Sequence, residues 1–180
     1  MLSNPSARPE PSKDFESFAG LRDNIHTQEG TMNSKLIHDA EQKTFALVFE
    51  KNDEVVQELT RFAKQHDLAA SHFTAIGAFK NAVLGFFDRE KKDYKKIPIN
   101  EQVEVLSLIG DIALSRGEPK LHAHAVLGKA DGAACGGHLL EARVWPTLEV
   151  VLTESPRHLH RKLDEETGLA LIDISVPENQ

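Results

Sequence analysis

Several features that would define a class of protein are missing from this sequence. It contains a single cysteine, Cys135, so no disulfide bond can form within the chain, as suits a reducing compartment. No segment approaches the roughly 20 consecutive apolar residues that a membrane-spanning helix needs. The first residues, MLSNPSARPEPSKDF, lack the charged segment and apolar run of a secretory signal. We therefore expect a cytoplasmic protein with no membrane partner.

Positive charge is in short supply. The chain has 21 lysines and arginines against 28 aspartates and glutamates, a formal net charge of -7. Such a chain repels phosphate backbones overall, so its charge does not support DNA as a partner unless a local basic patch exists. The run REKKDYKK offers such a patch, with Tyr94 available to stack on a base. Its candidate nucleic-acid contacts are Arg89, Lys91, Lys92, Tyr94, Lys95 and Lys96. A solvated loop is the simpler interpretation of this run. A second basic run, RHLHRK, is more simply interpreted as a solvated surface.

Signatures of well-defined enzyme classes are also absent. The sequence contains no Ser-His-Asp order, phosphate-binding loop or paired-carboxylate pattern that would identify a reaction. No substrate can therefore be named from such motifs, and whether the protein is an enzyme stays open.

The length of 180 residues suits one domain with a single core. Residues 1–34 are rich in proline, serine and charge and poor in apolar anchors, so we expect a flexible N-terminal extension there. The folded domain is expected over residues 35–175, followed by a C-terminal tail of residues 176–180.

Runs of alternating, β-branched and aromatic residues predict that strands dominate this domain. They are KTFALVFEK, SHFTAIGAFKNAVLGFFD, EQVEVLSLIGDIAL, LHAHAVLG, GGHLLEARVW and LEVVLTES. The second run is expected to form two strands with a bend or bulge at Gly77. The third is expected to be a strand pair, or one bent strand broken at Gly110–Asp111. REKKDYKK is expected to be a charged loop or hairpin tip.

One helix is predicted, in NDEVVQELTRFAKQHDL. Asn52 or Asp53 can cap its N-terminus. Its apolar stripe consists of Val55, Val56, Leu59, Phe62 and Ala63. The elements together predict an α+β fold, mainly antiparallel sheet with one long helix packed on it.

The segment PKLHAHAVLGKADGAACGGHLLEA concentrates three histidines. His122 and His124 are two residues apart, so on a strand they share a face. A hairpin turn at Asp131–Gly132 would bring His138 to within one residue of the level of His124. A bulge at Gly136–Gly137 is then expected to re-aim His138, because a one-residue slip would otherwise invert that side chain.

Three convergent imidazoles can hold a metal ion about 2.1 Å from each nitrogen, and three histidines with an open position form the ligand set of a catalytic zinc site. We therefore expect a divalent metal, zinc first, at His122, His124 and His138, although nickel, copper and iron also accept imidazole. Glu149 and Glu141 are the nearest carboxylates in sequence, and either is a candidate to orient a ligand or to act as a base near a bound water. The competing interpretation is three half-buried strand histidines, each with one hydrogen bond.

Three blocks of the sequence resemble the plant and prokaryote conserved (PPC) domain family, in its stand-alone bacterial type. They are FTAIGAFKNAVLGFFD, VEVLSLIGDIAL and PKLHAHAVLGKADGAACGGHLLEARVWPTLEVVL, and HAHAVLG…DG…GGHL is the most specific part. The likeness runs from about Lys35 to Ile174. It implies an antiparallel sheet with packed helices and a trimer whose histidine block lies near the subunit contacts. By resemblance, His122, His124 and His138 stand at the positions of the family's histidines.

Two hypotheses of function follow. The first is a metal-binding oligomer that binds a small molecule or carries out metal-assisted chemistry on it, with a purely structural metal equally consistent. The alternative is a DNA-associated regulatory or assembly protein, because bacterial members of the family often carry a DNA-binding label. Plant members grip the minor groove with an AT-hook, whose Arg-Gly-Arg-Pro core does not occur in this sequence.

Overall fold

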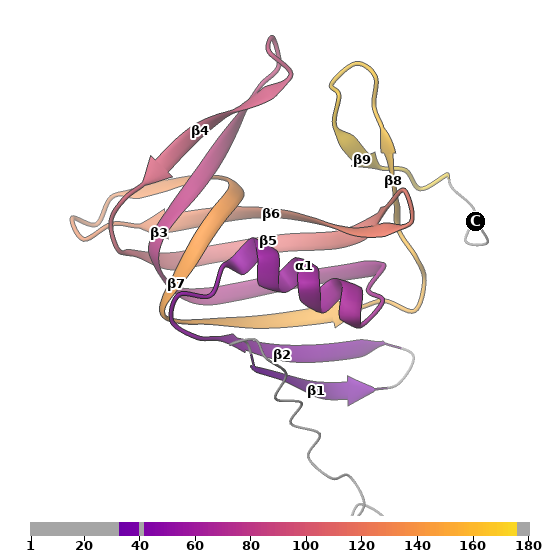
Figure 1. Cartoon of the computed structure of the whole chain (residues 1–180), viewed down its shortest axis with the longest axis horizontal. Helices are drawn as coiled ribbons and strands as arrows, with labels where there is room; N and C mark the ends of the chain where they lie inside the picture. The colour runs from indigo at the N-terminus through magenta and orange to yellow at the C-terminus, as the bar shows by residue number, and fades with distance from the viewer. Residues whose placement is uncertain (1–32, 40–41, 176–180) are drawn as a thin grey trace, which may run out of the picture.

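The computed structural model describes residues 33–39 and 42–175, which form nine strands and one helix (Figure 1). In chain order they are β1 (Asn33–Asp39), β2 (Lys43–Phe49), α1 (Val55–Gln65), β3 (Ala70–Asp88), β4 (Asp93–Ile99), β5 (Val103–Ser115), β6 (Glu118–Gly128), β7 (Ala134–Glu154), β8 (His160–Leu163) and β9 (Ala170–Ile172). The expected N-terminal extension and C-terminal tail lie outside the described residues, apart from the first two residues of β1. The helix in the described part of the chain is not long and apolar enough to cross a membrane.

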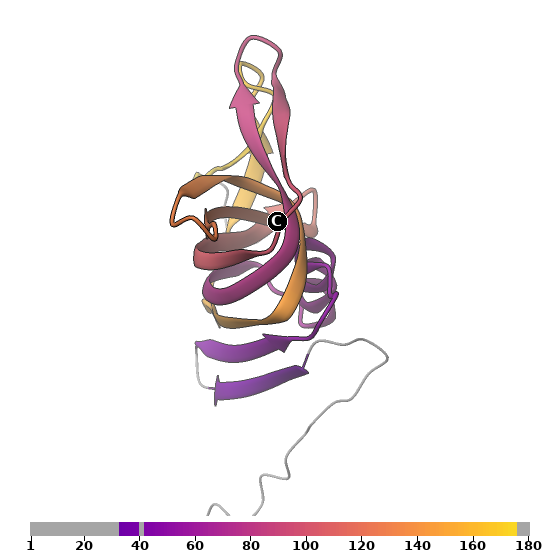
Figure 2. The same cartoon turned by 90° about the vertical axis from the view of Figure 1, so that its left-hand side faces the viewer.

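All nine strands belong to one sheet, in the order β1-β2-β7-β3-β5-β8-β9, with β4 on β3 and β6 on both β5 and β7. The pairings are antiparallel except for the parallel contact of β5 with β8. Because β6 also pairs with the start of β7, the strands β3, β5, β6 and β7 form a closed ring. Figure 2 looks along this curled sheet. The prediction of a mainly antiparallel sheet is confirmed.

Two hairpins stand out from the ring on the same side, and we call them the two arms (Figure 1). The first arm is the β3–β4 hairpin, with its tip at Arg89–Lys92, so the predicted hairpin tip at REKKDYKK is confirmed. The second arm is the β8–β9 hairpin. The arms touch, because Lys92 Nζ donates a hydrogen bond of 3.2 Å to the Glu165 carbonyl oxygen.

The strands are longer than the sequence pattern predicted. β3 is one strand of 19 residues with a bulge at Gly77, where an added Cβ would lie 2.3 Å from the Thr147 carbonyl oxygen. β5 runs through Gly110–Asp111 without a break, and its register shift lies between Val105 and Ser107. β7 is one strand of 21 residues that joins the two strands expected at GGHLLEARVW and LEVVLTES. Each of these strands stays paired because it meets different neighbours along its length.

The helix α1 packs on the ring through one buried face. That face consists of Val55, Leu59, Phe62 and Ala63. The Phe62 ring meets the ring of Phe45 in β2 edge-on, with centroids 5.2 Å apart. The helix has 11 residues, an ordinary length, so the expected long helix is not found. The segment NDEVVQELTRFAKQHDL is longer than the helix because its first three and last three residues cap or connect it.

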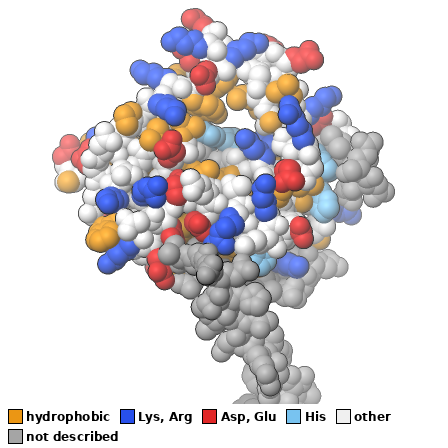
Figure 3. Space-filling model, in the orientation of Figure 1, with side chains coloured by type: hydrophobic (Ala, Val, Ile, Leu, Met, Phe, Trp, Pro, Cys, Tyr) orange, Lys and Arg blue, Asp and Glu red, His pale blue; other side chains and the backbone are white. Residues whose placement is uncertain are grey.

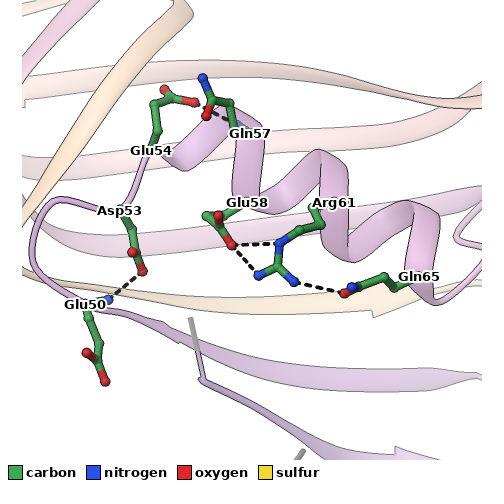
Figure 4. A network of polar contacts seen from close by, with 7 residues as sticks. All are labelled: Glu50, Asp53, Glu54, Gln57, Glu58, Arg61 and Gln65. Atoms are coloured by element: carbon green, nitrogen blue, oxygen red, sulfur yellow. Dashed lines mark hydrogen bonds and ion pairs between the residues drawn. The ribbon is translucent and has the colours of Figure 1, made fainter. Parts of the chain in front are cut away.

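The start of α1 also differs from the prediction, because Glu54 is the N-cap in place of Asn52 or Asp53. Its carboxylate accepts hydrogen bonds from the Gln57 amide at 2.7 Å and from the Ala142 amide of β7 at 3.0 Å. Asn52 has a φ of 72°, and Asp53 turns its carboxylate back to an earlier backbone amide. Figure 4 shows the contacts of Glu54 with Gln57 and of Asp53 with Glu50, together with polar side chains along the helix. Glu54 therefore ties the helix to β7.

Candidate metal centre

The three histidines meet on one face of the hairpin formed by β6 and β7. His124 pairs directly with His138 across the two strands, and residues in direct register share a face of the sheet. His122, two residues before His124, lies on that face as well. The alignment predicted from a turn at Asp131–Gly132 is therefore correct to within one residue.

The glycine pair has a different role from the one predicted. The register between β6 and β7 is unbroken, so no bulge forms at Gly136–Gly137. An added Cβ on Gly137 would lie 2.8 Å from the Gly85 carbonyl oxygen of β3, and one on Gly136 would lie 3.0 Å from the Ala125 carbonyl oxygen of β6. The two glycines let three backbones approach closely beside the histidines.

The imidazole rings form a compact triangle. Their centroids are 5.1 Å apart for His122 and His124, 5.2 Å for His122 and His138, and 5.3 Å for His124 and His138. The Nε2 atoms of His122 and His124 are 3.2 Å apart, and one nitrogen from each ring lies within 4.8 Å of the others. Nitrogens that share a tetrahedral zinc ion are about 3.4 Å apart. Modest side-chain rotations therefore suffice to bring all three nitrogens to one ion.

A carboxylate stands beside the triangle. Asp111 of β5 pairs in register with His122, and its Oδ2 lies 3.7 Å from His122 Nδ1. The other carboxylate oxygen pairs with Arg161 Nη2, and Arg161 Nη1 donates to the Ala170 carbonyl oxygen at 3.0 Å. A carboxylate next to the second nitrogen of a histidine orients that ring toward a metal.

Sequence reasoning missed both members of this pair. The sequence pattern places Asp111 at an expected strand break and Arg161 in the run RHLHRK, which is expected to be a solvated surface. The available signal for Asp111 was a lone carboxylate between apolar residues in a strand pattern, next to the strand that carries two histidines.

Tyr94 forms a wall of the site. Its ring stacks on the ring of His138, with centroids 4.6 Å apart and planes at 25°, and it meets Phe87 edge-on at 5.4 Å. Gly85 makes room for it, since an added Cβ there would lie 2.7 Å from Tyr94 Cδ1. Burial raises the pKa of the Tyr94 hydroxyl, so this group stays protonated near neutral pH. The residue expected to stack on a base stacks on a histidine within the chain.

The surroundings keep two of the histidines neutral. Burial, followed by the nearby His122, His124 and Lys120, lowers the pKa of His138 to about 4. Burial also lowers the pKa of His122, opposed in part by the Asp111 carboxylate. Neutral imidazole has a free lone pair, which a metal ligand needs. His138 Nδ1 is buried and has no hydrogen-bond partner among the described residues, which is unusual for a buried polar atom.

The group of described side chains that meets here contains neither Glu141 nor Glu149. Both are exposed. Glu141 lies 3.9 Å from Lys96 Nζ, and Glu149 lies far along β7, where it pairs with Val48 and Ile76. The carboxylate next to the histidines is Asp111.

The basic residues of REKKDYKK are interleaved with acids on the first arm. Lys91 Nζ lies 3.5 Å from the Asp88 carboxylate, while Lys92 and Lys96 contact the Glu165 carbonyl oxygen and the Glu141 carboxylate. The remaining two, Arg89 and Lys95, are exposed. The described part of this arm therefore presents mixed charge.

Comparison with family models matches residues 38–156 to the family described as the Plants and Prokaryotes Conserved (PCC) domain. A PPC protein of Pyrococcus horikoshii is 34% identical, with a TM-score of 0.69 over 78% of this chain and 94% of that one. A metal-containing protein of Archaeoglobus fulgidus is 36% identical, with a TM-score of 0.68 over 77% and 99%. A protein of Bacteroides thetaiotaomicron, provisionally described as DNA-binding, is 25% identical, with a TM-score of 0.73 over 79% and 99%. A comparison with curated proteins found no match.

The family match spans β2 to β7, including α1 and the three histidines, and thus well over half of the chain. The second arm, with Arg161, lies beyond the matched segment. The fold of the solved relatives agrees with the resemblance carried by HAHAVLG…DG…GGHL. The chain belongs to the Plants and Prokaryotes Conserved domain family.

Proposed function

We propose that this protein binds one divalent metal ion, zinc in the first place, through His122, His124 and His138. The observation that carries the proposal is the convergence of three ring nitrogens within 4.8 Å on one sheet face. The buried His138 Nδ1 without a partner supports it, because an ion would satisfy such a group. The description of the Archaeoglobus fulgidus relative as metal-containing supports it as well.

The donor set fits a metal that keeps one position for a ligand. Three neutral imidazoles add no charge, so a zinc ion there would keep its Lewis acidity and would lower the pKa of a bound water. Asp111 would hold His122 in one orientation, and Tyr94 would cover one side of His138. These residues form a site that binds a small molecule at the ion, and whether a reaction follows depends on that molecule.

Elemental analysis of the untagged protein tests the proposal. We expect about one zinc per chain in the wild type and less than a tenth of that in His124→Ala, because a two-histidine site holds zinc weakly. His158→Ala removes an exposed histidine outside the cluster and is the matched control. Equal metal content in the two variants would overturn the proposal.

We also propose that the chain assembles into a homotrimer through the outer face of the sheet. A single row of paired residues crosses the strands β7, β3, β5 and β6 in that order. Its members are Val151, Thr74, Ile109 and His124. Val151 is 50% and Ile109 54% exposed, one on each side of Thr74, and large apolar side chains exposed on one surface favour a protein contact. The histidines at the end of this row would then lie near the subunit contact.

Light scattering on a sizing column tests the assembly. A trimer of 20.0 kDa chains has a mass of about 60 kDa, and Ile109→Lys should lower it toward that of one chain, since a buried lysine opposes association. A wild-type mass of one chain at micromolar concentration would contradict the trimer.

DNA is a second candidate partner, favoured by the provisional description of the Bacteroides thetaiotaomicron relative. The exposed Arg89 and Lys95 would supply its phosphate contacts. Fluorescence anisotropy with a labelled duplex across a range of salt concentrations tests it, because phosphate contacts weaken steadily as salt rises. No binding near physiological salt would exclude this function.

A further inference from the structure

A cavity of about 440 Å³ opens next to the histidine cluster, between the two arms. His122, His138 and Tyr94 line one side of it, and Leu163 and Leu169 of the second arm line the other. In the space-filling view, a hollow lies between the arms with histidine at its edge and hydrophobic side chains around it (Figure 3). The contact of Lys92 with the Glu165 carbonyl oxygen bridges the arms beside this hollow.

Most of the lining is apolar, and part of it is exposed to solvent. It includes Val56, Leu121, Leu139, Leu140, Leu163, Leu169 and Leu171. Leu163 is 54% exposed and lies on the same face of the second arm as Arg161, an unusual position for a leucine that borders a hollow. Apolar side chains that gather in a concave surface with a few polar groups at one end are typical of a small-molecule site.

The charged groups of the lining all have one sign. Lys120 and Arg161 are its only charged side chains apart from the histidines, and no carboxylate belongs to the described lining. Arg161 is neutralised by Asp111, but Lys120 is exposed and has no ion-pair partner among the described residues. In a chain with a net charge of -7, this cavity is a local exception that favours an anion.

We propose that the cavity binds a small organic carboxylate with an apolar body. The carboxylate lies toward Lys120 and the histidine cluster, and the apolar body lies along the leucines of the second arm. The inference rests on the proposed metal function only in that an ion would add positive charge at the same end. A volume of 440 Å³ equals that of about fifteen water molecules in the liquid, which suits a ligand of about ten non-hydrogen atoms.

The second arm would determine which carboxylate fits. Its leucines make the apolar wall, and Arg161 anchors the arm to Asp111 beside the cluster. Residues 157–175 lie beyond the segment that matches the family. The histidines belong to the matched segment, and the opposite wall of the cavity lies outside it.

Titration of the isotopically labelled full-length protein with octanoate, followed by nuclear magnetic resonance, tests this inference. We expect saturable shifts at residues of the cavity and at least tenfold weaker binding of octan-1-ol, which has the same chain without the charge. Lys120→Met should weaken octanoate binding roughly tenfold, the size of one lost charge-assisted contact. Lys80→Met removes an exposed lysine outside the cavity and should change nothing. Leu163→Glu should weaken octanoate binding through the apolar wall.

The outcomes separate this inference from the metal proposal, because zinc content is measured on the same samples. Equal binding of octanoate and octan-1-ol, equal effects of the two lysine variants, or shifts outside the cavity would overturn the carboxylate site, whatever the zinc content. Octanoate binding that depends on Lys120 in protein that holds no zinc would support the carboxylate site and count against the proposed metal site. Chemical-shift changes at the cavity that depend on the concentration of the protein, and not on that of octanoate, would show that a second copy of the chain occupies the cavity. This result would overturn the inference.

Discussion

The Asp111–Arg161 pair offers the sharpest test of how the histidines are held. The Arg161 side chain is 5% exposed and that of Asp111 is 30% exposed. Asp111→Asn keeps the shape of the side chain and removes its charge. A nearly buried guanidinium then has no counter-ion, and His122 loses the carboxylate next to its Nδ1. Both the free energy of unfolding and the affinity for zinc should fall.

The magnitudes follow from the burial of the two groups. Breaking a fully buried ion pair from one side lowers the free energy of unfolding by about 3–5 kcal/mol. Because water reaches the Asp111 carboxylate, we expect about 2–3 kcal/mol for Asp111→Asn. Arg161→Leu leaves that carboxylate hydrated and should lower the free energy by about 1–2 kcal/mol. The double variant has no buried unpaired charge, so we expect a coupling energy of about 2 kcal/mol.

Urea unfolding of the zinc-free wild type, both single variants and the double variant measures this cycle by circular dichroism. Effects that add to within about 0.5 kcal/mol would refute the idea that Asp111 is the counter-ion of Arg161. Competition with a chelator measures zinc affinity, which should fall about 10- to 100-fold in Asp111→Asn. Unchanged zinc affinity in a folded Asp111→Asn protein would show that Asp111 does not orient His122.

Three further predictions concern the helix cap, the close backbone contact and the protonation of the cluster. Glu54→Ala removes a hydrogen-bond acceptor that serves both α1 and β7, so it should lower the free energy of unfolding by about 2 kcal/mol. Glu58→Ala removes only a pair within the helix and should change this free energy by less than about 0.5 kcal/mol. Urea titration compares the two variants. Gly137→Ala would force the β7 and β3 backbones apart, so we expect it to lower the free energy of unfolding by about 1–3 kcal/mol and to reduce the bound zinc. Urea unfolding and elemental analysis measure these effects. Gly132→Ala, whose Cβ would meet nothing, is the control for zinc content. In zinc-free protein, the unfolded state takes up a proton on His138 near pH 6.5 and the folded state only near pH 4. His138 therefore contributes fully to the free energy of unfolding above pH 6.5, and this contribution is lost as the pH falls to 4, by about 1–2 kcal/mol after allowance for the partial exposure of the ring. Urea titration between about pH 4 and 7 measures it, and a free energy of unfolding that depends on pH equally in the wild type and in His138→Phe would contradict the prediction.

The histidine cluster was predictable because it depends on two short-range rules. The two-residue spacing of His122 and His124 places them on one strand face, and the turn signal at Asp131–Gly132 sets the level of His138. These rules apply within the 17 residues from His122 to His138, and no distant contact is needed to apply them. The error at Gly136–Gly137 came from placing the pairing one residue off, which made a bulge necessary.

The rest of the site depends on partners that are far away in the sequence. Asp111 reaches His122 because β5 pairs with β6, and Arg161 reaches Asp111 because the chain returns to β5 after β7. Tyr94 reaches His138 because β4 folds back along β3 next to Gly85. Strand periodicity shows which residues share a face but not which strands are neighbours, so these contacts could not be derived from the residues alone.

The closed pairing of β3, β5, β6 and β7 has a consequence for how the ion would enter. Each strand of the histidine hairpin is also hydrogen-bonded along its outer edge, β6 to β5 and β7 to β3. Neither can slide against the other without breaking a second ladder, so the backbone positions of the three histidines would be fixed before any metal arrives. Loading is then a docking step onto a finished scaffold, unlike the metal-driven folding of a zinc finger. A chelator should strip the ion and leave the chain folded.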